Sequence, residues 1–166
     1  MCKRGLVSLC SGKKVPGTPE WIGAFSEYFN ADEKTVYKLA DQTSYEMGTL
    51  AEPLAVAVHT VNHAETRTGG LVILGAGTIG QLILAVARKR GYSPIIVTDT
   101  AAFNREFAVK HGADAALDPV TENIPEKVKE MTGGRGADLA IIAAGADNIL
   151  DQACECVHKC RSEEHT

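Results

Sequence analysis

The sequence predicts an α/β protein whose main part is a doubly wound parallel sheet. From residue 71 onwards, short apolar runs alternate with segments of helical periodicity. The apolar runs lack the polar alternation of half-exposed strands, which is typical of strands that helices cover on both faces. A glycine-rich turn joins the first run to the first helix of the series. With 166 residues, the chain is too short for two complete domains of ordinary size.

Residues 1–44 differ from the rest in composition. Lys, Gly, Ser and Pro are frequent in residues 1–20, which predicts a loop. Short apolar and aromatic runs at 24–29 and 35–39 predict two strands, and the polar residues 30–33 between them predict a turn. We therefore expect this segment to be the end of a β-rich unit.

Helical periodicity begins near residue 44 and continues to about residue 64. Pro53 must lie near a helix start or break the helix, because proline lacks the backbone N–H that an internal turn uses. Four apolar residues fall on one face of the expected helix: Leu50, Leu54, Val58 and Val61.

The strands of the main domain are expected at 71–74, 94–98, 115–117 and 139–143. The helices are expected at about 78–90, 104–111 and 125–131, and from about residue 148. Gly91 and Gly112 end the first two of these helices. A complete doubly wound sheet has further strands in a second half, so residues 45–160 are expected to form an incomplete Rossmann domain.

Three glycines follow the pattern of a dinucleotide-binding turn between a strand and a helix. Gly75 permits the tight turn, Gly77 leaves space for a pyrophosphate beside the backbone, and Gly80 lets the helix pack closely on the strand. The helix begins with Thr78, Ile79 and Gly80, so its free N–H groups and positive dipole end face the phosphates. These five residues form the predicted pyrophosphate site.

Asp99 ends the second apolar run, at the distance from the glycine turn that the motif requires. A carboxylate there accepts hydrogen bonds from both hydroxyls of the adenosine ribose and repels a 2′-phosphate, which predicts NAD rather than NADP. The simpler alternative is a turn residue that caps the next helix. Arg105 complicates the prediction, because an arginine near the ribose can accommodate a phosphate. It otherwise flanks the adenine or caps the helix.

Composition and charge argue against several classes of function. The formal net charge is −4 and no basic face stands out, so neither nucleic acid nor an anionic membrane is an expected partner. No apolar run approaches the ~20 residues of a membrane-spanning helix. Five cysteines without a signal peptide suggest a reducing compartment, and the cytoplasm is the expected location.

Four segments carry a family resemblance, at residues 23–28, 52–59, 75–80 and 136–138. Together they make the chain resemble the zinc-dependent medium-chain alcohol and polyol dehydrogenases, in the branch of the sorbitol, butanediol and threonine dehydrogenases. The resemblance implies hydride transfer from a secondary alcohol or polyol to NAD, zinc in the parent enzyme that stabilises the alkoxide, and a homo-oligomer. It also implies that residues 1–44 are a remnant of the GroES-like catalytic domain.

The same resemblance implies metal ligands. Cys2 and Cys10 match the last two cysteines of the structural zinc lobe, and Glu52 matches the glutamate that ligates or approaches the catalytic zinc. The simpler alternatives are free thiols and a helix-start acid that interacts with the helix dipole. The family's other ligands are missing from this sequence, although a zinc site needs three or four protein ligands.

The sequence is therefore expected to be a fragment of such an enzyme, truncated at both ends of the family pattern and inactive alone, with no catalytic residue assigned. Residues 161–166 are expected to be a non-native tail. One alternative is a non-catalytic dinucleotide-binding module. Another is a zinc-free quinone or enoyl reductase of the same superfamily, against which Cys2 and Cys10 argue. A methyltransferase, which also uses a glycine-rich turn, does not account for residues 23–28.

Overall fold

The structure is a computed structural model that describes residues 9–158. Its contacts divide the chain into two units, Met1–Thr43 and Ser44–Thr166. Across the described residues, no helix combines the length and the apolar character that crossing a bilayer would require. The predictions for Cys2 and for residues 161–166 lie outside the described part of the chain.

In the first unit, residues 9–43 contain little regular structure. Glu33–Thr35 form one turn of 3-10 helix. Thr18 and Trp21 form an isolated antiparallel bridge, and the Trp21 indole N–H donates a hydrogen bond to the Asn30 carbonyl oxygen at 2.8 Å. Local turns of this kind, rather than a sheet, organise the described part of the unit.

The strands predicted at 24–29 and 35–39 do not form, so this prediction was wrong. A strand needs a neighbouring strand for its hydrogen bonds and a layer that covers its apolar face. In the described chain neither is available to these residues, and the side chains of Phe25 and Tyr28 are exposed. Apolar and aromatic residues alone were not sufficient evidence for a strand.

The second unit begins with two helices in place of the single predicted one. Ser44 caps α1 (Tyr45–Thr49) by accepting a hydrogen bond from a backbone N–H of the first turn at 3.2 Å. The chain then turns at Leu50 and continues as α2 (Ala51–His63). Pro53 lies in the first turn of α2, where proline is tolerated, which confirms its predicted place near a helix start.

The strands of this unit are all parallel and follow the order β3-β2-β1-β4. Their bounds are β1 Gly69–Leu74, β2 Tyr92–Thr98, β3 Ala115–Leu117 and β4 Leu139–Ile142. The remaining helices are α3 Thr78–Arg90, α4 Ala102–Lys110, α5 Ile124–Met131 and α6 Ile149–Cys156. The predicted α/β class with a doubly wound parallel sheet is confirmed.

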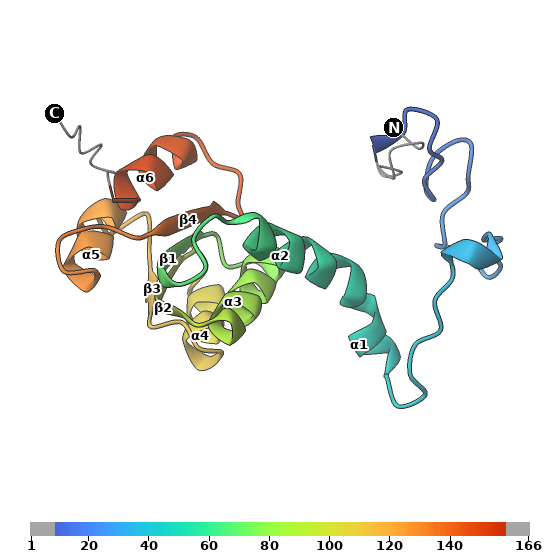
Figure 1. Ribbon diagram of the computed structural model, residues 1–166, viewed down its shortest axis with the longest axis horizontal. Helices are drawn as coiled ribbons and strands as arrows, with labels where there is room; N and C mark the ends of the chain where they lie inside the picture. The colour runs from blue at the N-terminus through green and yellow to red at the C-terminus, as the bar shows by residue number, and fades with distance from the viewer. Residues whose placement is uncertain (1–8, 159–166) are drawn as a thin grey trace, which may run out of the picture. The chain divides into compact units, whose positions relative to one another are not determined.

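The side chains of β1 alternate between two buried layers, because successive residues of a strand point to opposite faces. Leu71 and Ile73 pack in one cluster with residues of α2, α3 and α4. Val72 and Leu74 pack in another cluster with residues of α5 and α6. Figure 1 shows α5 and α6 on one side of the sheet and α3 and α4 on the other. Both faces are covered, which explains why the strand sequences are continuously apolar.

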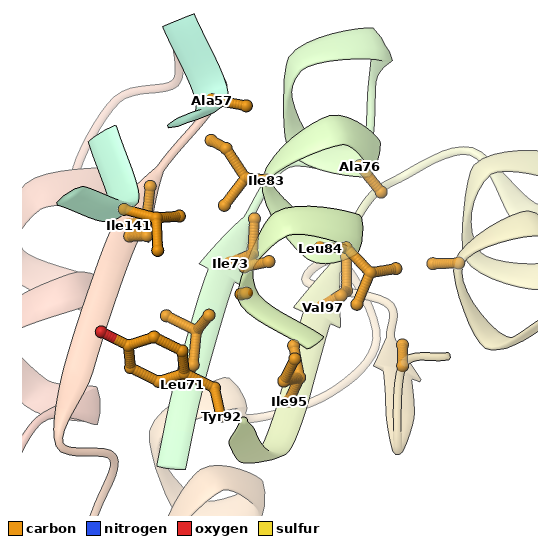
Figure 2. Close-up of a cluster of buried hydrophobic side chains, with 14 residues drawn as sticks. Ala57, Leu71, Ile73, Ala76, Ile83, Leu84, Tyr92, Ile95, Val97 and Ile141 are labelled. Carbon is orange, nitrogen blue, oxygen red and sulfur yellow. The ribbon is translucent and has the colours of Figure 1, made fainter. Parts of the chain in front are cut away.

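The first of these clusters anchors α3, the helix that follows the glycine turn (Figure 2). Ile83 and Leu84 of this helix are buried against Ile73 of β1 and Val97 of β2. The helix also ends sharply, because Gly91 adopts the left-handed conformation at its C-terminus with φ +92°. The direction of α3, and therefore of its N-terminus, is set by this packing.

At the start of β4, the chain that follows α6 returns to the sheet. Val157 forms a parallel bridge with Ala137. The Ala137 N–H donates to the Cys156 carbonyl at 2.8 Å, and the His158 N–H donates to the Ala137 carbonyl at 3.0 Å. Gly136 has φ +94°, and a Cβ on it would lie 2.8 Å from the Cys156 carbonyl oxygen. Glycine at this position therefore lets the two segments approach each other.

Candidate cofactor site

A cleft of about 620 Å³ lies at the carboxyl ends of the strands. Its walls come from the glycine turn after β1, the loop after β2, the loop between β3 and α5, and the β4–α6 loop with part of α6. Ligands of open α/β sheets bind at this edge, where the strand order reverses. In this sheet the reversal lies between β1 and β4. The fold thus places the cleft where a nucleotide site is expected.

Gly75 and Gly80 form the tight part of the turn. Gly75 has φ +107°, and a Cβ on it would lie 2.6 Å from the Cβ of Ala144. A Cβ on Gly80 would collide with the carbonyl oxygen of Gly75. A side chain at either position would therefore push α3 or the β4–α6 loop away from the end of β1.

Gly77 and Thr78 are exposed at the start of α3, whereas Ile79 is partly buried and Gly80 is buried. Apart from its chain neighbours, no described atom lies within 4 Å of the position that a Cβ on Gly77 would take. Gly77 is the N-cap of α3, and Thr78, Ile79 and Gly80 follow as its first residues. Backbone N–H groups in a first turn lack partners inside the helix, and the helix dipole makes this end suitable for an anion. The arrangement can hold a pyrophosphate.

Asp99 lines the cleft just after β2. One carboxylate oxygen accepts a hydrogen bond from the Ala76 N–H at 2.9 Å, and the other accepts one from the Ala101 N–H at 2.8 Å. Burial acts to raise the pKa of Asp99, but the hydrogen bonds from Ala101, Ala76 and Asn104 and the charge of Arg105 together outweigh it, so the net pKa is lowered. The carboxylate is charged at neutral pH and ties the glycine turn to the loop after β2. The carboxylate retains lone-pair capacity for a further hydrogen bond.

Arg105 lies in α4 and is not part of the cleft wall. Its Nη1 donates to the carbonyl oxygens of Asp99 at 2.7 Å and Thr100 at 2.9 Å. Its Nη2 forms an ion pair with Asp118 at 3.2 Å. Of the roles considered for Arg105, these contacts favour attachment of the Asp99 loop over direct contact with a ligand.

Gln81 was not among the predicted site residues, although its amide lies beside the glycine turn. Its Nε2 donates to the carbonyl oxygens of Ala76 and Asn104, both at 3.0 Å. Its Oε1 is buried without a hydrogen-bond partner in the described part of the chain. The contact with Asn104 depends on how α3 packs beside α4, so no local sequence signal could have revealed it.

The charged side chains of the cleft wall are all acidic within the described residues. They are Asp99, Glu122, Asp147, Asp151 and Glu155. Carboxylates gathered in one cleft create a negative potential that opposes an additional phosphate group.

The residues predicted as metal ligands are not assembled into a site by the described part of the chain. Glu52 is exposed on α2, and Cys10 is partly exposed in the first unit. From residue 9 to residue 158, no group of three or more His, Cys, Asp and Glu side chains is arranged to hold a metal ion. Because zinc needs three or four ligands, the described residues do not fit a zinc site.

The strand order and the glycine turn at the switch point define a Rossmann-type α/β domain. Residues 78–160 match the family model described as zinc-binding dehydrogenase. The chain belongs to this family, the zinc-dependent medium-chain alcohol and polyol dehydrogenases, as the sequence resemblance implied.

Individual relatives agree with this assignment. L-threonine 3-dehydrogenase from Pyrococcus abyssi is 35% identical over 156 residues, which cover 94% of this chain and 44% of the relative. The structure of 2R,3R-butanediol dehydrogenase from Bacillus subtilis matches with a TM-score of 0.74 and 32% identity, covering 82% of this chain and 39% of that one. A zinc-binding dehydrogenase from Sinorhizobium meliloti, solved with NADP, matches with a TM-score of 0.62 and 29% identity, covering 67% of this chain and 33% of that one. The chain spans less than half the length of the curated relatives that it matches.

Proposed function

We propose that this chain is the dinucleotide-binding part of an NAD-dependent, zinc-containing dehydrogenase that oxidises a secondary alcohol or polyol. The observation that carries the proposal is the Asp99 carboxylate, which lines the cleft, is ionised at neutral pH and is hydrogen-bonded to the glycine turn. NAD, when bound, supplies the hydride acceptor. The chain's own residues bind and orient the adenosine and pyrophosphate half of the cofactor.

Each part of that half has a matching group in the site. The N–H groups at the start of α3 bind the pyrophosphate, which approaches through the space left open at Gly77. Asp99 accepts hydrogen bonds from the ribose hydroxyls. Val120 and Ile149 add apolar surface to the cleft wall, where a flat base can lie.

The preference for NAD over NADP is supported by charge. Asp99 and the other carboxylates of the cleft repel a 2′-phosphate, and the guanidinium of Arg105 is occupied by Asp118 and two carbonyl oxygens. The Sinorhizobium meliloti relative was solved with NADP, so membership of the family does not decide the cofactor. The residues around Asp99 decide it in this proposal.

Calorimetric titration of the purified chain with NAD and NADP tests the proposal. We expect NAD to bind more tightly than NADP, and we expect Asp99→Ser to weaken NAD binding. Asp114→Asn is the matched control, because the Asp114 carboxylate also accepts a backbone hydrogen bond, from the Ile95 N–H at 2.6 Å, but lies at the amino ends of the strands, away from the cleft. An equal or stronger response to NADP would refute the Asp99 assignment, and no response to either nucleotide would refute the binding function.

We further propose that the isolated chain has no dehydrogenase activity, because its described residues assemble no metal site. The complete enzyme is expected to be a cytoplasmic homo-oligomer that takes a small alcohol or polyol. Formation of NADH can be followed after adding zinc and butanediol, sorbitol or threonine to the purified chain. Zinc-dependent formation of NADH with any of these substrates would overturn the proposal of inactivity.

A further inference from the structure

Asp118 directly follows β3 and is not one of the predicted site residues. Its Oδ2 pairs with Arg105 Nη2 at 3.2 Å, and its Oδ1 accepts a hydrogen bond from the Val120 N–H at 3.0 Å. The side chains of Arg105 and Asp118 are only 20% and 22% exposed. The pair is therefore better shielded from solvent than an ordinary surface salt bridge.

The position of Arg105 gives this pair its importance. Its guanidinium donates a hydrogen bond to the carbonyl oxygen of Asp99 itself, which places an arginine beside the predicted ribose site. A guanidinium beside the ribose is the group that binds a 2′-phosphate in NADP-dependent sites. Asp118 neutralises this guanidinium and holds its Nη2 edge at the loop after β3, and neither residue of the pair lines the cleft.

We propose that Asp118 is a positioning residue for cofactor specificity, which keeps Arg105 from binding a ribose 2′-phosphate. This inference rests on the proposed binding of NAD. Two barriers then oppose NADP: the charge of Asp99, and the engagement of Arg105 by Asp118. Removing Asp99 alone leaves the guanidinium occupied. Removing both carboxylates releases a cation beside a ribose site that has lost the carboxylate of Asp99.

A double-mutant cycle tests the inference with Asp99→Ser, Asp118→Asn and the double variant. The dissociation constants of NAD and NADP are measured by calorimetry, and 5′-AMP and 2′,5′-ADP serve as probes of the adenosine side alone. We expect the preference for the 2′-phosphorylated ligand in the double variant to exceed the product of the two single effects by about fivefold or more. If the role of Asp118 is purely structural, its substitution should weaken the binding of both ligands of each pair by the same factor. The ratio of their dissociation constants would then stay unchanged.

The control cycle combines Asp99→Ser with Asp114→Asn, which removes the charge from the Arg88–Asp114 pair at 2.6 Å. In this control cycle, the effects of the two substitutions on the ratio of NADP to NAD affinity should simply multiply. If the wild-type chain binds no NAD, the proposed function itself is refuted. If it binds NAD but the effects of Asp99→Ser and Asp118→Asn on the ligand preference simply multiply, only this inference is overturned.

Arg105→Ala gives an independent measurement if the double variant does not fold. The inference predicts that NAD and NADP binding weaken by similar factors, because the variant loosens the Asp99 loop and removes no phosphate ligand. Selective loss of NADP binding would show that Arg105 already contacts the 2′-phosphate in the wild-type chain, and would overturn the role given to Asp118.

Discussion

The backbones of Gly75 and Gly80 are in direct contact, so that a Cβ added to Gly80 would collide with the Gly75 carbonyl oxygen. Gly77, in the same turn, has open space at the equivalent position. The turn thus contains glycines of two kinds: some are required by the fold, and one leaves room for a ligand. Stability and binding measurements can separate them.

We expect Gly80→Ala to destabilise the chain by about 3 kcal/mol, because α3 must move away from the turn to admit the methyl group. Gly77→Ala should change the free energy of unfolding by less than about 1 kcal/mol, since this residue has a φ of −68° that alanine can adopt. The same variant should weaken NAD binding, because the methyl group enters the space proposed for the pyrophosphate. Urea denaturation and calorimetry measure the two effects. Equal stabilities of the two variants would contradict the packing argument.

Acid should destabilise the chain partly through Asp99 and Asp114. Burial acts to raise both pKa values, but hydrogen bonds from backbone N–H groups oppose it, and at Asp114 the guanidinium of Arg88 adds to them. The folded-state pKa values of both carboxyl groups are therefore lowered. A group of this kind stabilises the folded state above its unfolded pKa of about 3.9, and this stability is lost as pH falls through the folded value. The free energy of unfolding should therefore decrease below about pH 4. Urea denaturation across this range should show a shallower decrease for the variant with both Asp99→Asn and Asp114→Asn, and identical slopes would refute the assignment.

Gln81 offers a test of the hydrogen bonds beneath the glycine turn. Gln81→Glu replaces the amide donor by a carboxylate that faces the carbonyl oxygens of Ala76 and Asn104. We expect a loss of about 2 kcal/mol of stability at neutral pH, because like partial charges then meet in a partly buried place. The loss should shrink at acid pH, where the introduced carboxyl group binds a proton and can donate. Gln81→Met, which cannot titrate at this position, is the control, and a pH-independent loss for Gln81→Glu would contradict the explanation.

The two described cysteines of α6 should differ in reactivity. Cys156 is buried, and burial raises its pKa to about 11, whereas Cys154 is exposed. At pH values near 8, Cys156 therefore remains a protonated, inaccessible thiol, and the thiolate is the form that reacts. Alkylation of the native chain followed by peptide mapping should label Cys154 first and Cys156 only after addition of denaturant. Rapid native labelling of Cys156 would show that α6 does not pack as described.

The main domain could be predicted closely because its signals are local and repeated. The apolar run at 71–74 and the helix at 78–90 each carry their own periodicity, and Gly91 marks the helix end. Residues 24–29 carry similar apolar composition, but a strand also depends on a partner that the local sequence cannot supply. This difference explains why one part was predicted and the other was not.

The candidate site shows the same division. The glycine turn and Asp99 were found because their spacing follows a motif. The contacts of Arg105 with Asp118, and of Gln81 with Asn104, join segments that are distant in the sequence. Their partners depend on how neighbouring loops and helices pack, so residue type and spacing left the role of Arg105 open and gave no signal for Gln81.

The parallel bridge between Ala137 and Val157 also fixes the direction in which the sheet can grow. Among the described residues, β4 is the outermost strand on this side, and its Ile142 is 39% exposed. The unpaired backbone groups of an edge strand form a template for another strand. A strand that pairs beside β4, parallel to it as Val157 is, extends the sheet. If a strand of a second molecule pairs there instead, the same edge causes self-association. Pairing at this edge would therefore take place on the strand that adjoins the glycine turn, because the Ala143 N–H, directly after β4, donates to the Leu74 carbonyl oxygen at the end of β1 at 2.8 Å.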